Sequence, residues 1–540
     1  MEGVSTDKAP SASVVVPHFV VGALGFLTLS VLILRSSASF LGHYYQPELL
    51  VITHIAALGW VTMIIFGALY QLIPVVFETA LFSEAMAKIN LWAFTLGVVL
   101  LVYAFGTNSL GALLSWASAL TFLSLIMFAV NILLSVRKAT RQNYSSRFIV
   151  TAVFWLLFTA TMGFLLALNH TFTFLDVSNF RFLKIHAHFG ILGWFLQLIM
   201  GIASVLVPMF LVSHDLDERK LKKAYWLVNI GLTLLVAEWF LNGKGAFKPL
   251  SVVLIIAGIV FFLLYLWDAY KNKLRKLDIG MKLTMVAFTA IALPLILGIV
   301  LGFHFYTGKG MPQNLSTLYG FTIFFAFITP LILGQTYKTL PFIIWLNRYQ
   351  LLVGKKKIPM PADLFSTKIA AAHLWTYVGA ILFLTTGILA SSQFVMTLGA
   401  SLLVATALLY GINIGIILHH KTSIEALETK QETGSRSLLD LLKTVIDPEV
   451  EINIVDMGLI YKLDYDGDKK VDIEMTLSTP NCPIADSIVM NVMETIMNEH
   501  PDYDVNVHLV FEPKWTPDLI SPAGKLALRE GHKWKHQKTA

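Results

Sequence analysis

Twelve long apolar runs constrain this chain more than any other feature of its sequence. A helix needs about 20 apolar residues to cross a bilayer, and an open sheet cannot satisfy its edges in hydrocarbon. The chain of 540 residues is 56% hydrophobic and 14% charged, against about 25% charged in soluble domains. This balance excludes a disordered chain, a fibrous protein and an ordinary soluble enzyme. The sequence therefore predicts a mostly α-helical, polytopic bundle of twelve helices. The runs are 12–35, 47–77, 88–107, 110–136, 147–170, 184–211, 221–242, 248–270, 281–304, 314–341, 366–390 and 392–418.

Basic residues between the runs predict the orientation of this bundle. The loops after the fourth, sixth, eighth and tenth runs are rich in Lys and Arg, whereas the alternate loops carry few. The positive-inside rule then places both termini in the cytoplasm, and we expect the bacterial inner membrane. Because the net charge of +6 is concentrated in these loops, it indicates topology and lipid contact, and it does not suggest a nucleic-acid partner.

The composition changes after the last run. Residues 421–435 are polar and predict a linker between the membrane domain, 1–420, and a soluble unit, 436–532. That unit has the pattern of a small cytoplasmic α/β (α+β) domain, with a hairpin turned at Asp466-Gly467, an amphipathic helix over 483–500 and a strand over 505–511. Residues 533–540 form a basic tail, predicted to be solvated.

An internal repeat organises the membrane domain. Eight residues, including a His, a Trp, two Gly and a Pro, coincide between the second and sixth runs at an offset of 134, which aligns His54 with His188. The tenth run continues the pattern at an offset of 133, with Gly334 and Pro341 retained and Phe321 in the histidine position. We therefore predict three units of four helices around a pseudo-threefold axis, with His54 and His188 at one depth near the outer surface.

Intramembrane histidines predict a metal cofactor. Imidazole is a good ligand for haem iron and copper, and His54 and His188 on facing helices could bind one haem. His186 points roughly 200° away from His188 on the same helix, so it would serve a second cofactor or a hydrogen bond. Glu238, in the seventh run, is a candidate proton relay. The alternatives are that the histidines only pack and that Glu238 reaches water at its helix end.

The segments KIHAHFGILGW…LIMGIASVLVP and VITHIAALGW…FGALYQLIP resemble the haem-ligating helix of haem–copper oxidase subunit I, above all the cbb-type enzymes, and the twelve-span NnrS proteins. The resemblance implies haem b and leaves copper near His186 open. In the oxidases the His-x-His lies on the tenth span and copper histidines come from the sixth and seventh. Here the tenth and seventh runs have no histidine. We therefore do not expect a complete binuclear centre or oxygen reduction with proton pumping.

Cys482 is the single cysteine, which excludes a disulfide framework and a Cys-rich zinc site. It lies between a predicted strand and a predicted helix, and Pro483 suits the first helical position. A helix N-terminus favours the thiolate, so Cys482 is a candidate nucleophile or metal ligand. The alternative is an inert, half-buried cysteine.

The soluble unit as a whole resembles the SufT/PaaD-like iron–sulfur assembly domains. The matching pieces, in one collinear order, are DPE at 447–449, NIVDMGLIY at 453–461, MTL at 475–477, TPNCP at 479–483 and WTPDLIS at 515–521. The resemblance implies that Cys482 is the functional thiol, surrounded by Asp447, Asp456, Thr476 and Thr479. A transient iron–sulfur cluster at Cys482 would have to be shared with a second copy, a partner or glutathione, because one thiolate cannot hold it alone.

Three functions remain open from the sequence. The first is a membrane-anchored iron–sulfur assembly or maturation factor with a haem-binding, oxidase-derived core, whose partners are client apoproteins or cluster carriers at the cytoplasmic face. The second is a redox enzyme acting on nitric oxide, oxygen or quinol, and the third is a haem-free scaffold for the soluble domain. We favour an assembly or transfer factor over a terminal oxidase. The oligomeric state stays open.

Overall fold

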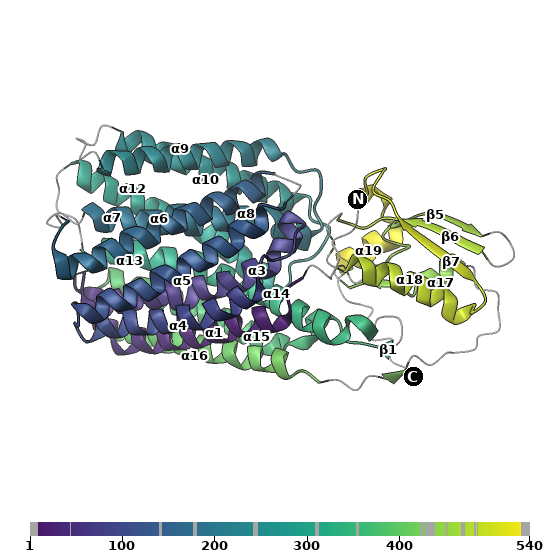
Figure 1. Ribbon diagram of the computed structural model, residues 1–540, viewed down its shortest axis with the longest axis horizontal. Coiled ribbons are helices and arrows are strands. Elements are labelled where there is room, and N and C mark those ends of the chain that lie inside the picture. Colours follow the sequence, from purple (N-terminus) through teal and green to yellow (C-terminus); the bar gives the residue numbers. More distant parts are fainter. Residues whose placement is uncertain are drawn as a thin grey trace.

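The computed structural model contains a long helical bundle with a small α/β domain at one end (Figure 1). It describes residues 9–43, 45–139, 143–175, 181–240, 247–307, 313–352, 356–421, 425–426, 438–448, 450, 452–465, 470–479, 482 and 484–530. The predicted turn at Asp466-Gly467, most of the predicted linker and the basic tail lie outside these residues, as do Pro480, Asn481 and Pro483.

The predicted membrane runs are helical. Within the described part of the chain, eleven helical segments are long and apolar enough to cross a bilayer. The predicted seventh span is the helix α9, Glu218–Phe240, which is less apolar and is not among the eleven. The other helices are α1 Ala12–Arg35, α2 Pro47–His54, α3 Met63–Phe77, α4 Glu84–Gly106, α5 Ala112–Val136, α6 Tyr144–Phe172, α7 Arg181–His188, α8 Gln197–Leu211, α10 Lys248–Lys271, α11 Ile279–Ala290, α12 Ala292–Tyr306, α13 Gln313–Phe321, α14 Thr329–Tyr349, α15 Thr367–Leu389 and α16 Gln393–His419.

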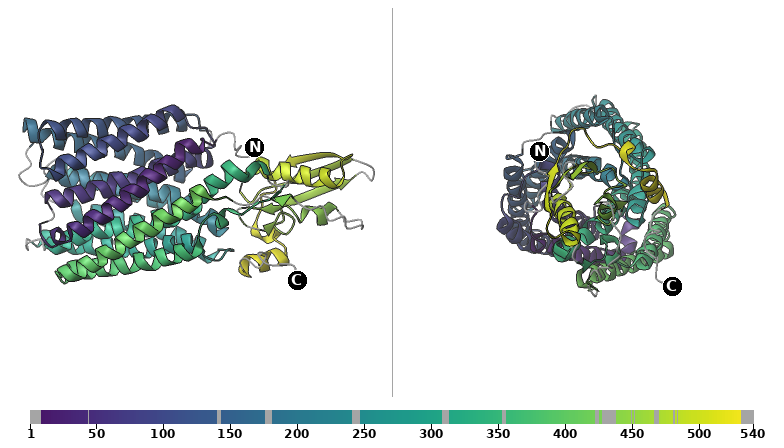
Figure 2. Two further views of the ribbon diagram at one scale, coloured as in Figure 1. Left: turned by 90° about the horizontal axis from the view of Figure 1, so that it is seen from below. Right: turned by 90° about the vertical axis from the view of Figure 1, so that its right-hand side faces the viewer.

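The bundle closes on itself, because α1 packs against α16, as the end view in Figure 2 illustrates. The glycines of the repeat explain how each unit packs. A Cβ on Gly67 would lie 2.7 Å from His18 Cβ on α1, one on Gly201 would lie 2.9 Å from the carbonyl oxygen of Ser145 on α6, and one on Gly334 would lie 2.5 Å from that of Gly280 on α11. Each glycine therefore permits the second helix of a unit to cross the first at contact distance.

A second feature of the repeat is a π-helical stretch, which links α2 to α3, α7 to α8 and α13 to α14. These stretches are Ile55–Thr62, Phe189–Leu196 and Thr322–Ile328, and they begin at equivalent repeat positions, 134 and 133 residues apart. No pattern in the sequence predicted these stretches. Because π-helical turns are rare and occur often at functional sites, they direct attention to the residues just before them, among which are His54 and His188.

The C-terminal domain has one three-stranded sheet in the order β5-β6-β7. Strands β5, Ile460–Tyr465, and β6, Lys470–Met475, are antiparallel as the hairpin prediction requires, and β7, Asp504–Leu509, is parallel to β6. The helix α18, Ala485–Glu499, connects the parallel pair and buries Ile488, Val492 and Ile496. The remaining elements are α17 Leu438–Leu442, the antiparallel pair β3 Ile446–Asp447 and β4 Ile452–Asn453, and α19 Pro522–Glu530.

Two short strands lie where the membrane domain leads into the linker. β1, Lys356–Lys357, pairs with β2, Glu425–Ala426, in antiparallel register. The Arg348 guanidinium donates hydrogen bonds to the carbonyl oxygens of Leu418 and His420 at the end of α16. These bonds fix the point from which the chain leaves the bundle.

Candidate functional site

His54 and His188 occupy equivalent places at the ends of α2 and α7. The Nδ1 of His54 lies 2.7 Å from the carbonyl oxygen of Leu50, and the Nδ1 of His188 lies 2.7 Å from that of Lys184. A carbonyl oxygen only accepts, so Nδ1–H donates in both rings and Nε2 carries the lone pair. A backbone carbonyl oxygen that accepts a hydrogen bond from one ring nitrogen is a usual support of a histidine that ligates metal through the other nitrogen.

His186 is supported in the same way by the neighbouring helix α6. Its Nδ1 lies 3.0 Å from the carbonyl oxygen of Thr159, and its ring lies over Gly163, where a Cβ would be 2.8 Å from Cε1. His186 is close enough to His54 for the two rings to interact electrostatically, whereas the charged neighbour of His188 is Lys184. His54 and His186 thus lie within electrostatic range of each other, on helices of the first and second repeats.

Aromatic rings flank the other two histidines. The His54 ring lies 4.8 Å from the Phe105 ring, and the His188 ring lies 4.8 Å from the Trp239 ring. Glu238, the residue before Trp239, is only 6% exposed. Its Oε2 accepts a hydrogen bond of 3.1 Å from the Phe247 backbone N–H, and its Oε1 has no hydrogen bond within the described residues. Glu238 is therefore adjacent in sequence to Trp239, whose ring contacts His188.

The donor set of this site can be tested against the two cofactors that the sequence suggested. Within the part of the chain that the structure covers, no three His, Cys, Asp or Glu side chains cluster closely enough to hold a metal ion. A bare copper ion therefore lacks a complete set of protein ligands there. A haem needs only one or two axial imidazoles, because the porphyrin supplies the other nitrogens. The histidines with free Nε2 lone pairs fit that requirement.

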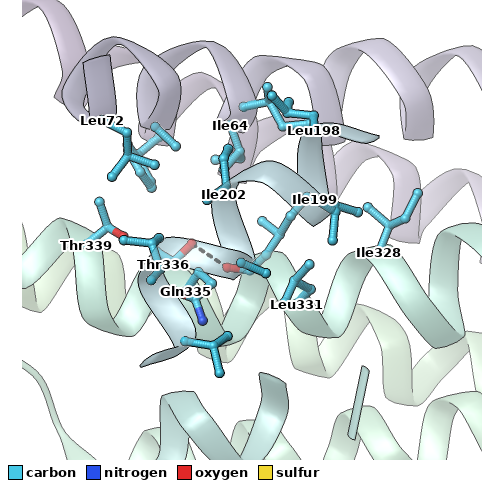
Figure 3. Close-up of a pocket in the computed structure, with 17 residues that line it drawn as sticks. Ile64, Leu72, Leu198, Ile199, Ile202, Ile328, Leu331, Gln335, Thr336 and Thr339 are labelled. Atoms are coloured by element: carbon cyan, nitrogen blue, oxygen red, sulfur yellow. Dashed lines mark hydrogen bonds between the residues drawn. The ribbon is translucent and has the colours of Figure 1, made fainter. Parts of the chain in front are cut away.

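A separate cavity lies between α3, α8 and α14 (Figure 3). Its volume is about 90 Å³, which suits a small apolar molecule and not a porphyrin. Its walls come from equivalent positions of the three repeats, and only the third contributes polar side chains, those of Gln335, Thr336 and Thr339. The lining residues are Phe19, Ile64, Ile65, Ala68, Leu72, Leu198, Ile199, Ile202, Ala203, Leu206, Val207, Ile328, Leu331, Ile332, Gln335, Thr336 and Thr339.

Cys482 lies at the other end of the molecule, in the C-terminal domain. It is 1% exposed, and its backbone N–H donates to the carbonyl oxygen of Thr479 at 3.3 Å. Its own carbonyl oxygen accepts from the N–H of Ala485, the first residue of α18. Cys482 therefore belongs to the turn that leads into the helix. His54 lies 23 residues before Phe77, the end of α3, which is a helical length of about 35 Å.

The predicted neighbours of Cys482 have distinct surroundings. Asp447 and Thr476 are each 1% exposed; an Asp447 carboxylate oxygen accepts from the Val450 N–H at 3.3 Å, and the Thr476 hydroxyl has no hydrogen bond among the described residues. Asp456 accepts hydrogen bonds of 2.6 Å from the Asn453 amide and the Ser521 hydroxyl. Asp456 therefore holds the start of α19 against the turn after β4.

The comparisons with known proteins divide the chain in the same way. The family described as "Iron-sulfur cluster assembly protein" matches residues 436–509. An "Fe-S protein maturation auxiliary factor" of Porphyromonas gingivalis is 38% identical over 104 residues, which are 19% of this chain and 94% of that protein. This chain belongs to the Fe-S protein maturation auxiliary factors.

The membership rests on the C-terminal domain. "Fe-S protein maturation auxiliary factor SufT" of Staphylococcus aureus is 40% identical over 85 residues, 16% of this chain and 96% of that protein. The likeness to SufT in the sequence is therefore confirmed.

The remainder of this maturation factor is similar to oxidases. "Cbb3-type cytochrome c oxidase subunit CcoN1" of Stutzerimonas stutzeri is 38% identical over 64 residues, 12% of this chain and 14% of that subunit. A chain of a solved haem–copper terminal oxidase dimer aligns at a TM-score of 0.52 and 10% sequence identity. The alignment covers 82% of this chain and 90% of the oxidase chain. The membrane domain thus has the fold of a haem–copper oxidase, as the repeat and the histidine motifs predicted.

Proposed function

We propose that this protein is a membrane-anchored iron–sulfur maturation factor whose oxidase-like domain binds haem b. The observation that carries the proposal is the union of a maturation-factor domain containing Cys482 with a helical bundle of oxidase fold. The distribution of Lys and Arg supports placement of the C-terminal domain at the cytoplasmic face of a bacterial inner membrane. Client apoproteins and cluster carriers would then meet the domain in the cytoplasm.

In this proposal Cys482 holds a cluster iron during transfer. One thiolate requires a second thiol donor, from a carrier, another copy of the chain or glutathione. Asp447, Thr476 and Thr479 would form the polar surroundings of the thiol, and Asp456 would fix the fold near it through its bond to Ser521.

His54 and His186 would be the axial ligands of the haem, because they lie within electrostatic range of each other on helices of the first two repeats. His188 is the alternative second ligand, because it occupies the repeat position of His54. A bound haem would supply a one-electron redox centre. The chain's own contribution is to orient the imidazoles through the carbonyl oxygens of Leu50 and Thr159, and to shield His54 from water with the Phe105 ring.

The haem proposal is tested by visible spectroscopy of the purified full-length protein. We expect about one haem b per chain in the pyridine haemochrome assay, and loss of the signal in His54→Ala and His186→Ala. His304→Ala is the matched control, because the His304 Nδ1 also bonds a carbonyl oxygen four residues earlier, that of Val300. Retention of full haem in both His54→Ala and His186→Ala would contradict the ligand assignment.

The maturation role is tested separately in cells that lack the native gene. We expect Cys482→Ser to reduce the iron content and activity of iron–sulfur enzymes to the level of the deletion, with the variant still present in the membrane. Comparison of His54→Ala with Cys482→Ser separates the two functions, because the first should remove the haem and only the second should affect client enzymes directly. Unchanged client activity in Cys482→Ser would remove the thiol from the proposal.

A further inference from the structure

The C-terminal domain contacts the bundle with the side that carries its cysteine. Ser487 lies in the first turn of α18, five residues after Cys482, and its hydroxyl accepts a hydrogen bond of 2.5 Å from the Gln350 side-chain amide. Gln350 directly follows the end of α14. Figure 2 shows the domain lying over this end of the bundle. The first turn of α18, which directly follows the turn containing Cys482, is therefore held against the membrane domain.

A second contact joins the two domains through aromatic rings. The imidazole of His214, between α8 and α9, packs edge-on against the indole of Trp515 with ring centroids 4.8 Å apart. Trp515 is 3% exposed, and its Nε1–H donates to the carbonyl oxygen of Met457, within the matched motif of the C-terminal domain. The His214 Nε2 is buried without a hydrogen bond in the described structure. A buried polar atom without a hydrogen bond costs free energy, which the packing of the two rings must offset.

The segment that presents His214 has an unusual backbone. Val212 has φ 51° and Asp215 has φ 57°, both in the left-handed region that β-branched residues in particular avoid. The carbonyl oxygen of Leu211 accepts hydrogen bonds from the N–H groups of Leu274 and Arg275, which anchor the segment to the next loop. Backbone of this kind persists only where its surroundings enforce it. The segment of residues 211–217, here called the ledge, therefore has a fixed backbone. Its His214 contacts Trp515 of the C-terminal domain.

We propose that this ledge and Gln350 make the membrane domain a cover for the thiol side of the maturation domain. The inference rests on the proposed function, because a client or carrier must reach Cys482 from that same side. Delivery then requires the C-terminal domain to leave the bundle. The length of the chain allows this movement: twelve residue steps separate Ala426 of β2 from Leu438 of α17, a contour of about 40 Å.

The single cysteine makes the cover directly measurable. Full-length protein in detergent is treated with a maleimide carrying a polyethylene glycol chain, and the gel shift gives the rate of Cys482 modification. The double variant His214→Ala with Gln350→Ala alters only the membrane domain, and we expect its rate to rise about tenfold or more, since it removes a hydrogen bond and an aromatic contact. Gln393→Ala is the matched control, because Gln393 makes the same amide–hydroxyl bond to Ser37 at the far end. Equal rates in all three proteins would overturn the proposal.

A cross-link tests the contact without relying on Cys482. In a Cys482→Ser background, we expect Gln350→Cys with Ser487→Cys to form a disulfide on mild oxidation, and Gln350→Cys with Met497→Cys, ten residues along α18, to form none. No cross-link in the first pair would also overturn the cover. Neither measurement depends on client activity. A failed maturation assay with a covered thiol therefore refutes the proposed function alone, and an uncovered thiol with a working maturation assay refutes the cover alone.

Discussion

The substitution Gly163→Ala tests whether Gly163 on α6 serves to position the His186 ring or only to stabilise the membrane domain. The new Cβ would lie 2.8 Å from His186 Cε1, 3.2 Å from Nδ1 and 3.6 Å from Nε2. Carbon atoms in contact prefer separations of about 3.5–4.0 Å, so the ring would have to move by roughly 0.7 Å or more. That movement also disturbs the 3.0 Å bond from Nδ1 to the Thr159 carbonyl oxygen.

The two effects of this methyl group on stability nearly cancel. Overpacking costs about 1–3 kcal/mol, and replacing Gly by Ala inside a helix gains about 1 kcal/mol. We therefore expect a net destabilisation of about 0–2 kcal/mol. Loss of an outer-shell support weakens metal binding about 10- to 100-fold, so haem affinity should fall much further than stability.

The assay is a haem titration of apoprotein followed by the reduced-minus-oxidised spectrum, with thermal unfolding measured on the same samples. Gly302→Ala is the control, because a Cβ there meets no atom within 4 Å. We expect Gly163→Ala to bind haem at least tenfold more weakly than Gly302→Ala. If the two variants bind haem alike while Gly163→Ala unfolds earlier, the position serves packing alone and His186 is not an axial ligand.

Three further results are expected. Gly334→Ala should lower the thermal stability of the membrane domain by about 3 kcal/mol, because its Cβ would lie 2.5 Å from the backbone oxygen of Gly280, which cannot move aside. Asp456→Ala should destabilise the C-terminal domain by about 1–3 kcal/mol in urea unfolding, since two donors in part-buried hydrogen bonds lose their acceptor. Burial lowers the pKa of His214 while the C-terminal domain is docked on the bundle, so protonation of His214 favours release of that domain. The ratio of the Cys482 modification rate to the rate in His214→Ala should therefore rise as the pH falls below about 6.5.

The elements that carry a periodic or motif signal could be predicted from the sequence. The helices follow from the length of the apolar runs, and the fold of the C-terminal domain from motifs spread over residues 447–521. The glycine at the repeat position is explained by structure: Gly67, Gly201 and Gly334 each permit close contact with the first helix of their own unit. Identity of residue type at a fixed offset was therefore a reliable guide to equivalent packing.

The contacts between repeats could not be predicted in this way. Register places His54 and His188 at equivalent positions, but it does not reveal that His54 lies within electrostatic range of His186, on a helix of the next repeat. The ledge containing His214 is a short polar loop without periodicity. Its position against Trp515 results from tertiary packing, which leaves no local pattern in the sequence.

The three π-helical stretches give this bundle a tolerance of length that its other helices lack. A turn with one extra residue returns to ordinary α-helix when one residue is removed, and the segments on either side keep their facing and their neighbours. A deletion elsewhere in a membrane helix rotates everything beyond it by about 100° and turns its packing face away. The second helix of each repeat unit can thus change length by one residue during evolution within its π-helical stretch. These stretches are Ile55–Thr62, Phe189–Leu196 and Thr322–Ile328. Alignments of related chains should place their single-residue gaps there.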